Sequence, residues 1–181
     1  MKNILFIIST FLLGISFSSG QTFTLKSKDI GGQATNKQVF NNFGCKGENI
    51  SPQLYWENTP EGTKSFAVTM YDPDAPTGSG FWHWVVFDIP ENTTELKSDA
   101  GNLSKNGAPA GCIQSSTDFG QPGYGGPCPP EGHGIHQYLI TVFALKVNKL
   151  GLDKNATPAF VGFNLHANTI AKASLVMYYK R

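Results

Sequence analysis

Hydrophobic and polar positions along the chain follow the two-residue period of β-strands in several short segments. Strict alternation predicts a half-buried strand in TFTLKS, and nearly continuous apolar runs predict buried strands in SFAVTMY, WHWVVFDI and YLITVFAL. Shorter strands are predicted at PQLYW and at SLVMYYK. The predicted strands therefore span residues 22–27, 52–56, 65–71, 82–89, 138–145 and 174–180.

One segment, Thr157–Ala173, has the features of a helix. Thr157 can cap it and Pro158 suits its first turn. Gly162 weakens the interior, and the part with the highest helical preference is Thr169–Ala173. With so few helical signals, the chain is predicted to be mainly β.

The region Asn92–Gly134 is rich in Gly, Pro, Ser and Asn and gives few signals for strand or helix. Loops of this length in a compact domain are usually functional. We expect this region to contribute to a binding surface.

The N-terminal segment has the pattern of a secretory signal peptide. Lys2 supplies the positive charge, Ile4–Phe17 is almost wholly apolar, and Ser18–Gly20 provides small residues before Gln21. The apolar run is about 14 residues, short for the roughly 20 that span a bilayer, although an uncleaved membrane anchor is the alternative. The sequence predicts cleavage after residue 20, export to the periplasm or the medium, and one domain over residues 21–181.

Charge is balanced along the chain. There are 14 basic and 13 acidic side chains, and without Lys2 they balance at 13 each. No basic stripe is present, so neither nucleic acid nor an anionic membrane is an electrostatically favoured partner. Aromatic residues make up 12% of the chain, which indicates a folded globular domain.

Export would permit a disulfide among Cys45, Cys112 and Cys128. Our first expectation is a bond between Cys112 and Cys128, which both lie in the Gly/Pro-rich middle. Cys45 with Cys128 is the close alternative, because pairing depends on spatial separation that the sequence does not give. The spacings match no zinc motif.

The segment YDPDAPTGSGFWH concentrates acids, aromatic residues and a histidine. Strand alternation predicts that His83 faces away from Trp82 and Trp84. If the strands on either side of this segment are antiparallel neighbours, Asp72 lies near His83 and favours its charged form, which would be a positive pole for an anion. The alternatives are that Asp72 and Asp74 cap a turn and that His83 is a structural hydrogen-bond donor.

A second segment, GPCPPEGHGIHQY, has the same character. His136 begins a predicted strand and shares a face with Tyr138, whereas His133 is expected to be a solvated loop residue. The glycines allow the backbone to approach a ligand closely. Neither a phosphate-binding glycine fingerprint nor a nucleophile elbow occurs here.

The order DPDAP, WHW and GPCPPEGHGIHQY closely resembles the phosphatidylethanolamine-binding protein family, and its bacterial Raf-kinase-inhibitor-like branch most of all. The resemblance covers almost all of the chain after residue 20. It implies a large central antiparallel sheet packed on a smaller sheet, with one or two short peripheral helices and an anion pocket at one edge of the large sheet. The ligand-binding residues that it implies are Asp72, Asp74, Phe81, Trp82, His83, Gly126, Cys128, Pro129, Pro130, His136 and Tyr138.

The chain departs from the family pattern at Gln137, where the family often has arginine. The resemblance also implies a possible homodimer and no cofactor. Three functions compete: a binding protein for a small anion or phosphorylated headgroup, an inhibitor or interaction protein acting on an exported partner, and an enzyme with His83 or His136 as base and Asp72 orienting it. No nucleophile or metal set completes the third, so we expect a binding protein, with affinity that falls as pH rises through the imidazole pKa.

Overall fold

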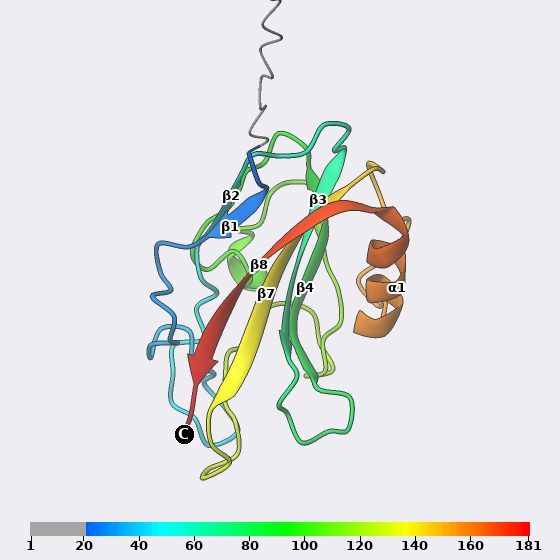
Figure 1. Ribbon diagram of the computed structural model, residues 1–181. Helices are drawn as coiled ribbons and strands as arrows, with labels where there is room; N and C mark the ends of the chain where they lie inside the picture. Colours follow the sequence, from blue (N-terminus) through cyan, green and yellow to red (C-terminus); the bar gives the residue numbers. More distant parts are fainter. Residues whose placement is uncertain (1–20) are drawn as a thin grey trace, which may run out of the picture.

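A five-stranded antiparallel sheet forms the centre of the computed structural model, which describes residues 21–181 (Figure 1). Its strand order is β6-β4-β3-β7-β8. The long apolar runs of the sequence form its three inner strands, as expected for strands that are covered on both faces. The bounds are β3 Ser65–Asp72, β4 Phe81–Pro90, β6 Ile113–Gln114, β7 His136–Leu145 and β8 Thr169–Tyr179.

A smaller antiparallel sheet of order β1-β2-β5 packs on one face of the large one. Helix α1 lies on the opposite face, as Figure 1 shows with β1 and β2 on one side of the large sheet and α1 on the other. This arrangement confirms the predicted mainly β fold. The remaining bounds are β1 Thr24–Lys26, β2 Leu54–Glu57, β5 Glu95–Leu96, the 3₁₀ helix η1 Leu103–Lys105 and α1 Pro158–Asn168.

Two hydrophobic clusters stabilise these layers. The larger one lies between the sheets and contains Trp56, Phe66 and Trp84, all almost fully buried. The smaller one joins the other face of the large sheet to α1 through Val161 and Leu165. Each large apolar side chain that is fully buried stabilises the folded protein by roughly 1.5–3 kcal/mol. The two clusters therefore hold the sheet fixed from both sides.

The predicted helix is shorter than expected. It ends at Asn168, and Thr169–Ala173 belongs to β8, where Ala173 lies opposite Val142 of β7. The prediction of helix over Thr169–Ala173 is therefore wrong. Pairing with β7 outweighs a local helical preference that sums to little over five residues.

A β-bulge at the start of β4 changes the direction of its side chains. The pairing with β3 shifts by one residue at Tyr71, which lies opposite Trp82, so that His83 is an extra residue. Trp82 packs on Tyr71 on the α1 face. The ring centroids of His83 and Tyr138 lie 5.1 Å apart. Tyr138 belongs to the cluster between the sheets, as does Trp84. His83 thus faces away from Trp82, as predicted, but shares a face with Trp84, because the bulge interrupts the alternation.

The disulfide joins Cys45 to Cys128, with the two Cα atoms 6.0 Å apart. Our first expectation, Cys112 with Cys128, is wrong. The loop before Cys45 runs beside the segment that carries Cys128, where Phe40 N–H donates to the Pro127 carbonyl. Cys112 remains a free thiol packed against the cluster between the sheets.

No helix among residues 21–181 is both long enough and apolar enough to cross a membrane. The predicted signal peptide, residues 1–20, lies outside the described residues.

Candidate functional site

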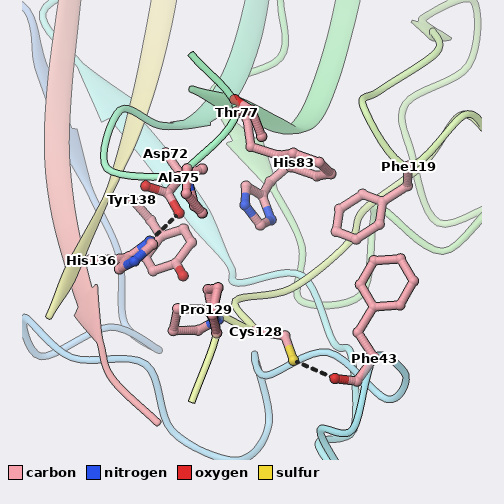
Figure 2. A pocket seen from close by; sticks show the side chains of 13 residues that line it. Phe43, Asp72, Ala75, Thr77, His83, Phe119, Cys128, Pro129, His136 and Tyr138 are labelled. Atoms are coloured by element: carbon pink, nitrogen blue, oxygen red, sulfur yellow. Dashed lines mark hydrogen bonds and ion pairs between the residues drawn. The ribbon is translucent and has the colours of Figure 1, made fainter. Parts of the chain in front are cut away.

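The end of β3 and the starts of β4 and β7 meet at one edge of the large sheet, because these three strands are antiparallel neighbours. Three loops close over this edge, at the lower end of the molecule in Figure 1. They enclose a pocket of about 180 Å³, shown in Figure 2. Its lining residues are Phe43, Asp72, Ala75, Pro76, Thr77, Phe81, His83, Phe119, Cys128, Pro129, Pro130, His136 and Tyr138.

Asp72 and His136 form a buried pair in this pocket. His136 Nδ1 lies 2.7 Å from Asp72 Oδ2. Asp72 is only 2% exposed and His136 only 1%. The other carboxylate oxygen, Asp72 Oδ1, accepts the backbone N–H of Asp74 at 2.8 Å. Both oxygens of the carboxylate therefore have protein donors, as buried charges require.

Asp72 favours the charged form of His83, as predicted, but the two side chains make no hydrogen bond. His83 Nδ1 lies 2.8 Å from the carbonyl oxygen of Gly125, and its ring packs against those of Phe81, Phe119 and Tyr138. Burial lowers the pKa of His83 to about 4, although the Gly125 carbonyl and the Asp72 charge favour the charged form. His83 is thus neutral near pH 7 and is no positive pole.

Tyr138 has a fully buried side chain whose hydroxyl has no hydrogen-bond partner among the described residues. Burial raises the pKa of this phenol, and the negative charge of Asp72 raises it further, so the hydroxyl keeps its proton. A buried hydroxyl without a partner is uncommon in native proteins and needs an explanation. The nearby Asp72 carboxylate, which favours the protonated phenol by hydrogen bonding as well as by its charge, is one candidate partner, and a ligand in the pocket that Tyr138 lines is the other.

His133 extends the buried pair toward solvent. Its Nδ1 lies 2.8 Å from His136 Nε2, so one proton is shared between the two rings. The sequence predicted a solvated loop residue, and His133 is exposed but bonded. Its spacing of three residues from His136 gave no signal of this contact, because the turn of the glycine-flanked loop creates it.

Aromatic side chains from distant loops form the opposite wall, and sequence reasoning missed them. Phe43 and Phe119 stack with their ring centroids 5.8 Å apart. The disulfide at Cys128 fixes the Phe43 loop against this wall, and Arg181 Nη1 donates to the Phe43 carbonyl oxygen at 3.1 Å. Figure 2 shows Phe43 and Phe119 across the pocket from His136. Both phenylalanines occur in loops without strand or helix signals.

Eight of the predicted site residues line the pocket and three do not. Asp74 points away and accepts the Gln137 backbone N–H at 2.8 Å, which ties the turn after β3 to the start of β7. Trp82 lies on the other face of the sheet. Gly126 supports the wall from behind, where an added Cβ would lie 1.9 Å from the Gln38 carbonyl oxygen.

The pocket is polar on one side and apolar on the other. None of the described residues that line it is a lysine or an arginine, and the Arg181 guanidinium lies behind the wall formed by Phe43 and Cys128. Across residues 21–181 no group of three or more His, Cys, Asp or Glu side chains is arranged to hold a metal ion. The arrangement suits binding of a small polar group by hydrogen bonds.

Comparisons with known proteins agree with the predicted family and fold. A sequence profile described as "Phosphatidylethanolamine-binding protein" matches residues 31–180. The UPF0098 protein YbcL of Escherichia coli K12 is 49% identical over 177 residues, which cover 96% of this chain and 97% of YbcL. YbhB of the same strain is 46% identical over 149 residues, covering 82% of this chain and 93% of YbhB.

Solved structures extend the agreement to three dimensions. The crystal structure of E. coli YbcL, titled a new member of the mammalian PEBP family, superposes with a TM-score of 0.86 at 50% identity over 88% of this chain and 98% of that one. A homologue from Chlamydia trachomatis superposes with a TM-score of 0.72 at 26% identity, covering 88% of this chain and 97% of that one. The chain therefore belongs to the phosphatidylethanolamine-binding protein family.

Proposed function

We propose that this chain is an exported binding protein that holds a small phosphate-like anion or phosphorylated headgroup in the pocket at the edge of the large sheet. The observation that carries the proposal is the buried Tyr138 hydroxyl, which lines the pocket and has no partner among residues 21–181. The hydroxyl is enclosed in the structure, so an anionic oxygen would complete its hydrogen bonding after a small shift of the lining side chains. Such charge-assisted bonds are stronger than bonds between neutral groups.

The Asp72 carboxylate does not oppose this assignment. Both of its oxygens accept protein donors, which offsets part of its repulsion toward an anion. The two histidines, His133 and His136, share one proton between facing nitrogens, and a proton gained by this pair would offset the charge of Asp72. Protonation of these histidines therefore favours an anion, and affinity falls as pH rises.

Pocket size limits the ligand to a small group. Its volume of about 180 Å³ is below the roughly 300–1,000 Å³ of pockets for drug-sized ligands. We therefore propose that a headgroup or free anion enters the pocket and that acyl chains do not.

Calorimetric titration with inorganic phosphate and with phosphorylethanolamine, between about pH 5.5 and 8, tests the proposal. We expect binding that weakens as pH rises and that is lost in the His83→Ala/His136→Ala variant. A matched control is His166→Ala, which changes an exposed histidine on α1. Equal affinity of the double variant and the wild type would contradict the proposal.

Export is the second part of the proposal. It is supported by the signal-peptide pattern of residues 1–20 and by the Cys45–Cys128 disulfide, a bond typical of oxidising compartments. N-terminal sequencing of the protein recovered outside the cytoplasm is expected to begin at Gln21. Recovery of an intact chain beginning at Met1 in the cytoplasmic fraction would count against export.

An interaction role is the second candidate, and exposed aromatic residues on α1 favour it. Phe160 and Phe163 are 53% and 71% exposed, and Ile170 at the start of β8 is 40% exposed. A second copy of the chain or an exported protein could cover them. The Phe160→Ser/Phe163→Ser variant tests this role by light scattering and by capture of proteins from the exported fraction. If the particle mass and the captured proteins are both unchanged in the variant, this support is removed.

A further inference from the structure

We infer that the pocket selects the protonated form of a phosphate-type anion, because His83 presents a hydrogen-bond acceptor to the ligand. This inference rests on the proposed function and narrows its ligand class. The ligand would be inorganic phosphate or a phosphate monoester that keeps one P–OH group. An anion of similar shape without a proton, such as sulfate, or a phosphodiester would be disfavoured.

The hydrogen bond of His83 fixes its tautomer. Its Nδ1 lies 2.8 Å from the Gly125 carbonyl oxygen, and a carbonyl oxygen can only accept a hydrogen bond. Nδ1 therefore carries the proton. In the neutral ring the other nitrogen, Nε2, then has a free lone pair and is an acceptor.

The His83 ring stays neutral in this environment. His83 is 5% exposed and is packed among the rings of Phe81, Phe119 and Tyr138, which offer no charge. Two carboxylates act on it, Asp72 from β3 and Asp118 from the loop after β6, and both favour protonation.

Burial outweighs these two charges, since the pKa of His83 falls to about 4. His136, on the neighbouring strand β7, directs its Nδ1 to Asp72 and its Nε2 to His133, so it makes no hydrogen bond with His83.

The acceptor atom, His83 Nε2, faces the pocket. His83 Nε2 has no hydrogen-bond partner among the described residues and is not among their fully enclosed polar atoms, so it is open to the pocket that His83 lines. Figure 2 shows the ring between Asp72 and Phe119, facing the space above Pro129. The pocket thus offers an open acceptor at His83, whereas the donor at Tyr138 is enclosed and reaches a ligand only after a small shift of the lining side chains.

This pair of groups distinguishes anions by their protons. A phosphate monoester has a second pKa near about 6, so below that pH it offers one P–OH donor and several acceptor oxygens. Sulfate and phosphodiesters offer acceptors only, and with them His83 Nε2 would face an anionic oxygen without a hydrogen. Leaving a buried acceptor unpaired weakens binding by roughly 10-fold or more.

The test compares four ligands by calorimetry at about pH 5 with the full mature chain, because a phosphate monoester is then mostly protonated and His83 is still mostly neutral. The phosphate groups of inorganic phosphate and phosphorylethanolamine are then singly charged with at least one P–OH, glycerophosphorylethanolamine is a diester, and sulfate has no proton. We expect the first two to bind at least about 10-fold more tightly than the last two. A difference between the first two would separate free phosphate from a headgroup as the source of the ligand.

His83→Asn is the decisive variant, because an asparagine amide can still donate to the Gly125 carbonyl but has no acceptor at the position of Nε2. We expect the preference for phosphate over sulfate to fall to about onefold. Tyr138→Phe is the matched control, since it removes a donor that serves both anions and should weaken both alike. The ¹⁵N chemical shift of His83 in the wild-type protein reports directly whether Nε2 is unprotonated, and needs no variant.

Equal affinity for phosphate and sulfate in the wild type, or a protonated His83 Nε2, would overturn the inference and leave the proposed function standing. Persistence of the preference in a folded His83→Asn variant would overturn the role of His83. Failure of all four ligands to bind would remove the proposed function and this inference together.

Discussion

Burial and hydrogen-bond direction decide what each side chain of the pocket can offer a ligand. Asp72 and His136 satisfy one another and lie almost out of contact with solvent, whereas Tyr138 keeps a hydroxyl without a partner. Residue types in the sequence predicted an acid and two histidines in one site. They did not predict that Asp72 pairs with His136 and not with His83, because that choice depends on the Gly125 carbonyl, which the sequence does not mark.

The lowered pKa of His83 predicts a pH dependence of stability. The folded pKa is about 4, below the ordinary value of 6.5, so between these values the unfolded chain binds more protons than the folded one. Stability therefore falls as pH drops below about 6.5 and levels off below about 4, with a total loss on the order of 3 kcal/mol from this residue.

Urea unfolding of the wild type and of His83→Asn between about pH 7 and 4 measures this difference. Other titrating groups are common to both proteins, so the two stability curves should converge as pH falls. Parallel curves would show that His83 has the same pKa in the folded and the unfolded chain.

Among the elements, the three inner strands of the large sheet, β4, β3 and β7, were the most predictable. Their apolar runs are long, and the sheet is covered on both faces there. The two-residue strands β5 and β6 and the helix η1 were missed, because such short pairings depend on neighbours and not on local pattern. The bulge at His83 also has no sequence signal, although it turns this residue toward the pocket.

Two glycine substitutions test the packing of particular elements. Gly162 lies inside α1, and an added Cβ there would meet nothing within 4 Å, so Gly162→Ala should raise the free energy of unfolding by about 0.5–1 kcal/mol. Gly126→Ala should lower it, because the new Cβ would lie 1.9 Å from the Gln38 carbonyl oxygen. Thermal unfolding gives both values, and a destabilised Gly162→Ala would contradict the environment described for α1.

In the whole molecule, the pocket combines parts that are distant in sequence. The sheet supplies Asp72 and His136, while Phe43 and Phe119 come from two loops that fold back on its edge. The polar half was predictable because it lies beside recognisable strands and family motifs. The aromatic half was not, since its place depends on how the loops around Cys45 and Cys128 are joined.

The disulfide contributes to stability by closing a long loop. Cys45 and Cys128 are 83 positions apart, for which chain-entropy estimates give about 4.5 kcal/mol. The Cys45→Ala/Cys128→Ala variant should lose about this much in urea unfolding, and Cys112→Ala much less. Burial raises the pKa of the Cys112 thiol to about 11, so it should react slowly in the folded protein. Alkylation of the denatured, unreduced chain should label Cys112 alone, and a labelled Cys45 would refute the pairing.

The claim that this pocket binds an anion is tested most directly by Tyr138→Phe. The variant removes only the hydroxyl that has no partner among the described residues, so the free energy of unfolding should stay the same or rise. Its affinity for phosphate at about pH 6, measured by calorimetry beside the wild type, should fall by roughly 10- to 100-fold, because a hydrogen bond to a charged group is lost. A folded Tyr138→Phe protein that binds phosphate as tightly as the wild type would contradict the account.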